Sequence, residues 1–256
     1  MFQYLRQCLA IADVELRKLL RDPTELFTRA IQPVLWLTVF GQVLSNARGI
    51  DTGKVGYLAF MTPGILAQSV LFAAIFYGIA VIWERDLGIV HKLLVSPANR
   101  SALIIGKAIS ASFRGLVQAA VIYVIALALG VPIRAGLASA GGVVLVVTLG
   151  SAVFSTFSLV IACAVKTRER FMGIGQVLTM PLFFASNAIY PLQMMPGWLR
   201  SIAGANPLTY FVDALRGLMI QGGQSIYGIG WDCGVLLLVF LGLLAIATRA
   251  YPHLVQ

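Results

Sequence analysis

The chain has 256 residues, of which 59% are hydrophobic and 11% charged, and its mean hydropathy is +0.88. Soluble domains usually carry about a quarter charged residues, so this composition excludes an ordinary soluble fold and indicates a polytopic membrane protein. The formal net charge of +9 does not require a nucleic-acid partner, because membrane proteins collect Lys and Arg in their cytoplasmic loops; we expect no nucleic acid.

The N-terminal segment 5–22 has the pattern of an amphipathic helix. Leu5, Leu9 and Leu16 recur at helical spacing, whereas Arg6 and Arg17 fall on another side. A cationic helix with too many charges to span predicts a position in the membrane interface. The alternative, an amphipathic helix on a soluble domain, is disfavoured by the apolar remainder of the chain. Residues 1–30 are charged throughout, so no cleavable signal peptide is expected.

Six segments are candidates for membrane-spanning helices, which need ~20 mostly apolar residues each. They are 27–45, 57–83, 103–131, 137–165, 171–190 and 231–250. The first is the weakest, because it carries Arg29, Gln32 and Pro33 near its start. Lys and Arg are concentrated in the segments that share a side with the N-terminus, which predicts that both termini are cytoplasmic.

The segment 84–100 joins the second and third candidate spans on the cytoplasmic side. It begins with the charged pair Glu84-Arg85 and continues to the apolar pair Leu93-Leu94. A short interfacial helix over Glu84–Leu94 carrying both pairs could dock into a groove on a soluble partner. The alternative is a solvated connecting turn.

The segment 191–222 is too apolar for an aqueous loop, yet its prolines forbid one continuous helix. The pattern predicts two short helices, 196–203 and 207–220, with Asn206-Pro207 as the corner, since Pro is well tolerated in a first helical turn. Non-helical backbone at membrane depth must be covered by protein or line a cavity, and a re-entrant hairpin on the outer side satisfies that rule. Asp213 and Arg216, three residues apart, are expected to form a local ion pair that secures this hairpin.

Motifs for catalysis, nucleotide binding and metal binding are missing from the sequence. There is no phosphate-binding loop and no H-E-x-x-H motif, and Cys8, Cys163 and Cys233 lie far apart. We therefore expect no enzyme activity, no cofactor and no metal in this chain. The candidate spans contain few ionisable residues, which disfavours an ion-coupled carrier and places the energy source on another chain.

Two runs of sequence resemble the type 2 ABC transporter permeases. Residues 180–217, MPLFFASNAIYPLQMMPGWLRSIAGANPLTYFVDALRG, match the signature around the family's outer hairpin. Residues 83–107 are similar to its cytoplasmic coupling region, and the order and spacing of both runs fit nearly the whole chain. One departure is Asp86-Leu87-Gly88-Ile89, where family members often have Glu-x-Gly-Thr, so no role of that Thr is transferred to Ile89.

The resemblance implies a single domain, 1–256, with an all-α membrane fold: six transmembrane helices, an N-terminal interfacial helix and an extracellular re-entrant helical hairpin. It implies two permease copies, taken as identical, with two separately encoded ATP-binding subunits that carry MgATP, in the bacterial inner (plasma) membrane. The residues expected to couple to the ATPase are Glu84, Arg85, Leu93 and Leu94. The residues expected in the outer gate are Tyr190, Pro191, Pro196, Trp198, Asn206, Pro207, Asp213 and Arg216.

The substrate expected from the resemblance and the aliphatic composition is hydrophobic or amphiphilic: a drug, a lipid or a lipo-oligosaccharide. Spans one, two and five would line its route. The residues proposed for the path are Phe72, Phe76, Gln176, Phe183, Phe184 and Asn187. Alternatives are a permease for lipid-linked polysaccharide, an ion-coupled secondary carrier and a purely structural membrane component.

Overall fold

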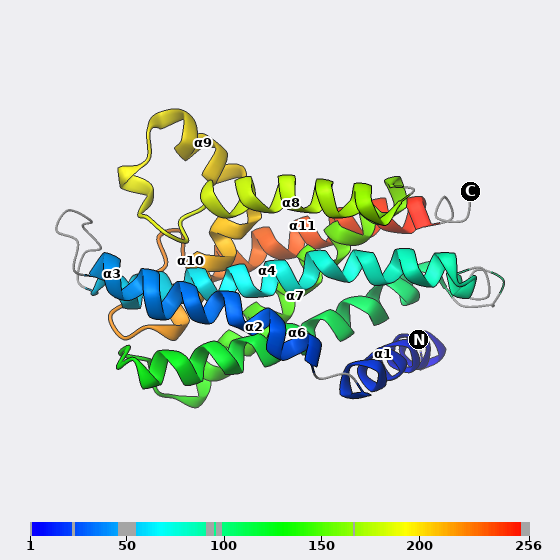
Figure 1. Cartoon of the computed structure of the whole chain (residues 1–256), viewed down its shortest axis with the longest axis horizontal. Helices are drawn as coiled ribbons and strands as arrows, with labels where there is room; N and C mark the ends of the chain where they lie inside the picture. The colour runs from blue at the N-terminus through cyan, green and yellow to red at the C-terminus, as the bar shows by residue number, and fades with distance from the viewer. Residues whose placement is uncertain are drawn as a thin grey trace.

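The computed structural model describes residues 2–21, 24–45, 55–90, 95, 99–165 and 167–251, which form a bundle of mostly long helices (Figure 1). No strand occurs among these residues; an isolated bridge joins Ile133 and Ile220. The expected all-α fold is therefore confirmed. The helices, in chain order, are α1 Phe2–Arg21, α2 Thr24–Leu35, η1 Trp36–Phe40, α3 Gly41–Ser45, α4 Tyr57–Asp86, α6 Arg100–Ala128, α7 Leu137–Ala164, α8 Arg168–Phe184, η2 Leu192–Met194, α9 Gly197–Ala205, α10 Pro207–Met219 and α11 Ile229–Ala250.

Four helices of the described chain, α4, α6, α7 and α11, are long and apolar enough to cross a membrane. They coincide with the predicted spans 57–83, 103–131, 137–165 and 231–250 to within a few residues. The other two predicted spans, 27–45 and 171–190, correspond to apolar helices shorter than these four. Ile31–Ser45 is the apolar part of the first, and α8 is a 17-residue helix that ends at Phe184 rather than 190.

The helix that begins at Thr24 contains a π-helical segment, η1. Here the Gly41 N–H donates to the carbonyl of Trp36, five residues earlier, instead of the usual four. The Trp36 ring stacks on Phe40 at 4.4 Å between centroids and meets the Phe183 ring edge-on at 6.2 Å. The widened turn thus directs an indole ring towards α8.

Helix α4 lies at the centre of the bundle and is the most buried of the four long helices. Its glycines allow close approach: a Cβ on Gly64 would stand 2.3 Å from the carbonyl oxygen of Ala188. A Cβ on Gly78 would stand 2.4 Å from Ser158 Oγ, which accepts a hydrogen bond from the Gly78 N–H. Small residues at such contacts are typical of membrane helix packing.

The two ends of the bundle carry different elements (Figure 1). Helix α1 lies at the end where α4 finishes and α8 begins, and it packs on α6, where Gly106 faces Cys8 and Ile11. The turn 185–191 and helices α9 and α10 lie at the opposite end. The two short helices predicted over 196–203 and 207–220 are confirmed as α9 and α10, with the corner at Asn206-Pro207, whereas their re-entrant position in a membrane stays a prediction.

Candidate functional site

Four charged side chains meet inside the protein near the end of α4. Lys107 of α6 places its Nζ 2.6 Å from Glu84 Oε2 and 3.5 Å from Glu15 Oε1 of α1. Arg114, two turns further along α6, has an Nη2 atom 4.0 Å from the other Glu15 oxygen. All four residues are buried. We call Glu15, Glu84, Lys107 and Arg114 the ionic cluster.

The charges of the ionic cluster balance, with two carboxylates against two cations. The ring of Tyr77 adds a cation–π partner, 4.7 Å from the Arg114 guanidinium carbon and 5.6 Å from Lys107 Nζ. A buried charge is tolerable only when it is paired, so each of α1, α4 and α6 needs the others in place. The cluster therefore joins the N-terminal helix to the two long helices.

The prediction that Glu84 lies on a separate docking helix is wrong. No Pro or Gly occurs between Gly78 and Gly88, so α4 continues through Glu84 and Arg85 to Asp86 and ends where Gly88 adopts a positive φ of 71°. The Glu84 carboxylate consequently lies beside Lys107 inside the bundle. Leu93 and Leu94 lie outside the described residues.

Arg85 is partly buried at this end of the bundle. It donates to the carbonyl of Val165 at 3.2 Å and pairs with Asp86 at 3.1 Å. Asp86 also pairs with Arg168 at 2.8 Å, and the Arg168 guanidinium lies 3.5 Å over the Trp83 ring. Arg85, Asp86 and Arg168 thus form a partly exposed charged patch that joins α4 to the start of α8.

The ionisable residues Lys107 and Arg114 lie inside the predicted span 103–131, and no role was predicted for them. Both are buried in α6. Their spacing of seven residues, which puts them on one helical face, was the available signal.

The predicted ion pair between Asp213 and Arg216 is present, at 3.9 Å within α10. Arg216 also donates to the carbonyl of Asn187 at 2.7 Å, and its guanidinium lies 3.9 Å over the Phe60 ring. These contacts attach α10 to the turn 185–191 and to α4. Tyr57 adds a hydrogen bond from its hydroxyl to the Ile189 carbonyl at 3.1 Å.

Asn206 connects three elements at the corner of the hairpin. Its side-chain oxygen accepts from the Leu208 N–H at 3.0 Å and so caps α10, with Pro207 as the first helical residue. Its amide donates to the carbonyls of Leu182 at 2.7 Å and Ala185 at 2.9 Å. Those carbonyls lie at the end of α8, where helices leave carbonyls without partners, and this explains why α8 stops at Phe184.

A cleft of about 670 Å³ lies between α8 and α9. Predicted gate residues line it, namely Tyr190, Trp198, Asn206 and Pro207, together with Phe184 from the predicted path. The Tyr190 hydroxyl donates to the Phe184 carbonyl. Pro191 and Pro196 instead precede η2 and α9 on the connecting loop.

The residues predicted for the substrate path do not share one surface. Phe183 and Asn187 are fully buried, whereas Gln176 and Phe184 are exposed on α8. Phe72 and Phe76 stack on each other at 6.4 Å between centroids and are partly buried on α4.

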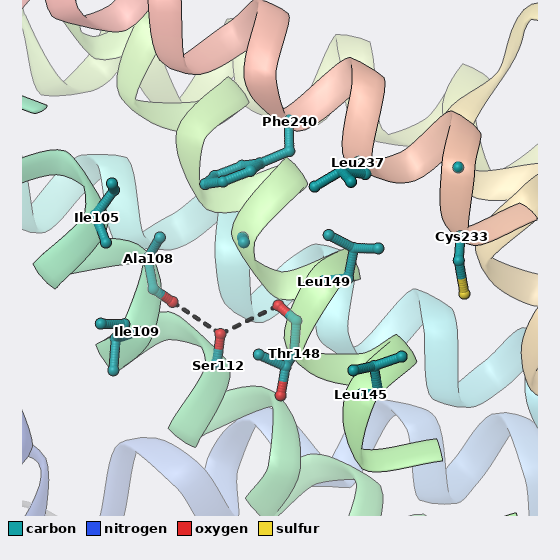
Figure 2. A pocket seen from close by; sticks show the side chains of 12 residues that line it. Ile105, Ala108, Ile109, Ser112, Leu145, Thr148, Leu149, Cys233, Leu237 and Phe240 are labelled. Carbon is teal, nitrogen blue, oxygen red and sulfur yellow. Dashed lines mark hydrogen bonds between the residues drawn. The ribbon is translucent and has the colours of Figure 1, made fainter. Parts of the chain in front are cut away.

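A second hollow, of about 500 Å³, is a groove between α6, α7 and α11. Figure 2 shows apolar side chains such as Ile109, Leu145 and Phe240 around it. The Ser112 hydroxyl lies within hydrogen-bond distance of the carbonyls of Ala108 at 2.9 Å and Thr148 at 3.1 Å (Figure 2). The hydrogen of this hydroxyl is therefore used by the backbone around the groove. The groove suits an apolar occupant.

Comparison with known proteins gives a family match over most of the chain. The model for the ABC-2 type transporter family matches residues 6–220. The chain is 31% identical to the "Putative transport permease ycf38" of Cyanophora paradoxa over 204 residues, which cover 78% of this chain and 69% of that protein.

Two further relatives carry names that refer to drug resistance. The "Daunorubicin resistance ABC transporter permease protein DrrB1" of Streptomyces coeruleorubidus is 26% identical, over 88% of this chain and 77% of that protein. The "Probable doxorubicin resistance ABC transporter permease protein DrrC" of Mycobacterium tuberculosis is 27% identical, over 91% of this chain and 85% of that protein.

Proposed function

Because this chain belongs to the ABC-2 type transporter family, we propose that it is the permease subunit of an ATP-driven exporter whose ATP-binding subunits are separate chains. The observation that carries the proposal is the family match over residues 6–220, which include three of the four long apolar helices, in a sequence without a phosphate-binding loop. ATP must then be bound by a partner. Two copies of that partner and a second copy of this chain complete the proposed complex.

The proposed topology has six spans, with both termini in the cytoplasm of a bacterial cell and the hairpin outside. The helix from Thr24 to Ser45 supports this count, since at ~1.5 Å per residue it is about 33 Å long, enough for a bilayer core. It exposes Leu35, Val39 and Val43, side chains that favour lipid or a second permease copy. Helix α8 exposes Val177 and Met180 in the same way.

The proposed substrate is a hydrophobic or amphiphilic molecule such as a drug, a lipid or a lipo-oligosaccharide. Two features support it: the mostly apolar walls of the cleft between α8 and α9, and the relatives named for daunorubicin and doxorubicin resistance. Trp198 and Tyr190 in the cleft also offer aromatic faces for sugar rings, so a lipid-linked polysaccharide is the second candidate.

The proposed contact with the ATP-binding subunit comprises α1 and the patch of Arg85, Asp86 and Arg168. Because the ionic cluster fixes α1 to α4 and α6, a push on α1 is passed to both long helices. Arg85→Ala removes one of the two cations of this patch but leaves Lys107 and Glu84 paired. We expect this variant to insert normally, to bind the ATP-binding subunit more weakly and to transport less. Normal binding and transport would contradict the assignment of Arg85.

The whole proposal is tested by co-purification with the product of an adjacent reading frame that carries a nucleotide-binding domain. The reconstituted complex should show ATPase activity that rises with doxorubicin, a lipid or a lipo-oligosaccharide, and inside-out vesicles should accumulate that compound when ATP is supplied. Flux driven by a proton or sodium gradient without any ATPase would instead support the secondary carrier.

A further inference from the structure

Two buried carboxyl groups share one hydroxyl where α10 meets α11. Asp213 of α10 and Asp232 in the first turn of α11 are both fully buried. Ser225, in the connecting segment, places its Oγ 3.0 Å from Asp213 Oδ2 and 2.8 Å from Asp232 Oδ2. Both distances are within hydrogen-bond range.

The hydrogens available at this site do not suffice for two ionised carboxylates. A serine hydroxyl has one hydrogen, and an ionised carboxylate can only accept. Ser225 Oγ already accepts from the Gly228 N–H at 2.7 Å, so its own hydrogen can reach only one of the two acids. The other contact requires a hydrogen that belongs to a carboxyl group.

The surroundings identify which acid carries that hydrogen. Asp213 Oδ2 accepts from the N–H groups of Ile226 at 2.6 Å and Tyr227 at 3.1 Å, and Arg216 lies 3.9 Å from Oδ1. These donors stabilise an ionised Asp213. Asp232 Oδ1, in contrast, is buried and has no hydrogen-bond partner among the described residues, so only the N-terminal end of α11 would offset a negative charge there.

We propose that Asp232 is protonated at neutral pH and that its proton locks the hairpin helix α10 to α11. Asp232 Oδ2–H donates to Ser225 Oγ, and the Ser225 hydroxyl donates to Asp213, whose charge is balanced by Arg216. This makes the pair a proton-binding site, whichever compound the protein moves.

The titratable groups facing Asp232 come from three elements. They are Asp213 of α10, behind which Arg216 lies, Tyr227 of the connecting segment and Cys233 of α11 itself. Helix α7 carries no Asp, Glu, Lys, Arg, His or Tyr, and the α6 residues that line the groove against α11 do not titrate. Deprotonation of Asp232 would therefore put a second negative charge beside Asp213. The proton can leave through the segment 224–228, where Gln224 and Ile226 are exposed.

Infrared spectroscopy of the purified full-length protein at neutral pH tests the protonation directly. The wild type should show the carbonyl stretch of a protonated carboxylic acid, shifted in D₂O, and Asp232→Asn should lose that band. Asn is nearly isosteric, and its N–H can replace the donor of the acid, so the fold should persist. Asp86→Asn, which changes an exposed paired carboxylate, is the matched control and should keep the band.

A second measurement follows thermal stability between mildly acidic and mildly alkaline pH. The protonated site stabilises the native state, so the wild type should lose stability as the pH rises, whereas Asp232→Asn should lose less. An infrared band unchanged by Asp232→Asn, or equal pH dependence in both proteins, would overturn the proposal. Restoration of alkaline stability by sodium would assign the site to a cation and equally overturn it. These readouts need neither ATP nor substrate, so failure of the exporter assignment leaves them unaffected.

Discussion

Lys107 is the residue on which the ionic cluster depends most, because it contacts both Glu84 and Glu15. Lys107→Met removes the cation and leaves two buried carboxylates with one cation between them. Removing one partner of a buried ion pair typically costs about 3–5 kcal/mol. We expect a marked loss of thermal stability in detergent, measured by fluorescence-detected size-exclusion chromatography after heating.

Lys107→Arg is the conservative control, since it keeps the charge and should retain most of the stability. Arg17→Ala removes the exposed ion pair between Arg17 and Asp13 on α1 and should change little, because surface pairs contribute less than about 1 kcal/mol. A Lys107→Met protein as stable as the wild type would mean that the cluster does not hold α1 against the bundle.

Substitutions of Asn206 can distinguish its two roles, which are capping α10 and joining α10 to the end of α8. Asn206→Ala loses the cap of α10 and both bonds to the end of α8, and we expect a loss of about 2–4 kcal/mol from the lost cap and two buried carbonyls without donors. Asn206→Ser keeps an oxygen that can cap α10 but loses the amide donors. Urea or thermal unfolding should place Asn206→Ser between the wild type and Asn206→Ala; equal stability of Asn206→Ser and the wild type would contradict the role of the amide.

The contrast between Asn206 and Glu84 shows what local sequence can predict. Asn-Pro is a helix-start signal carried by adjacent residues, so the corner of the hairpin was predictable. The burial of Glu84 depends on Lys107 of another helix and Glu15 of a third, and hydropathy of a single segment contains no such information. The Asp213–Arg216 pair was predictable for the same reason as the corner, because its partners are three residues apart.

At the scale of the elements, α4 packs directly against the backbone of the turn 185–191. This contact is possible because Gly64 has no side chain. A Cβ there would stand within 2.8 Å of three backbone atoms of Ala188, and backbone cannot rotate away. Gly64→Val should therefore cost at least the ~1–3 kcal/mol typical of overpacking and should loosen the hairpin end. The measurement is the yield and thermal stability of monodisperse protein.

Gly173→Val is the matched control for Gly64→Val. Gly173 also lies inside a helix, α8, but no atom within 4 Å would meet its Cβ. The control should express like the wild type. Equal losses in both variants would point to helix propensity or membrane insertion rather than to the contact with Ala188.

Four long helices were predictable because each is a continuous run of apolar residues bounded by polar, charged or turn-forming residues. Helix α8 was predicted to extend to 190, but its end is set by the Asn206 amide, which approaches from 21 or more residues away in the chain. Helix α4 runs three residues beyond the predicted span 57–83, because Glu84 and Arg85 continue it instead of beginning a separate interfacial helix. A charged residue lowers the hydropathy of a segment and so marks the end of a predicted span. It does not prevent the backbone from continuing as a helix.

At the scale of the whole molecule, α4 connects the ionic cluster with the hairpin end (Figure 1). Its last turn holds Glu84, and near its start Phe60 and Gly64 contact Arg216 and the turn 185–191. A displacement of α1 at one end can therefore reach the hairpin at the other through one continuous helix. Neither the contact between α1 and α6 nor the central position of α4 could be predicted from the sequence, because both depend on which helical faces meet.

Cys8 provides a probe for motion of α1 in the assembled transporter. Its side chain is buried where α1 meets Gly106 of α6, and burial raises the pKa of the Cys8 thiol, so less reactive thiolate is present at neutral pH. In a variant with Cys163 and Cys233 changed to Ala, maleimide should label Cys8 slowly in the resting protein. If the ATP-binding subunit acts through α1, labelling should accelerate during ATP turnover, measured by mass spectrometry.

Leu9→Cys in a Cys8→Ala background, on the exposed face, should label rapidly in every state. An unchanged rate at Cys8 during turnover would show that α1 and α6 move as one body, and the ionic cluster would then act as a fixed joint.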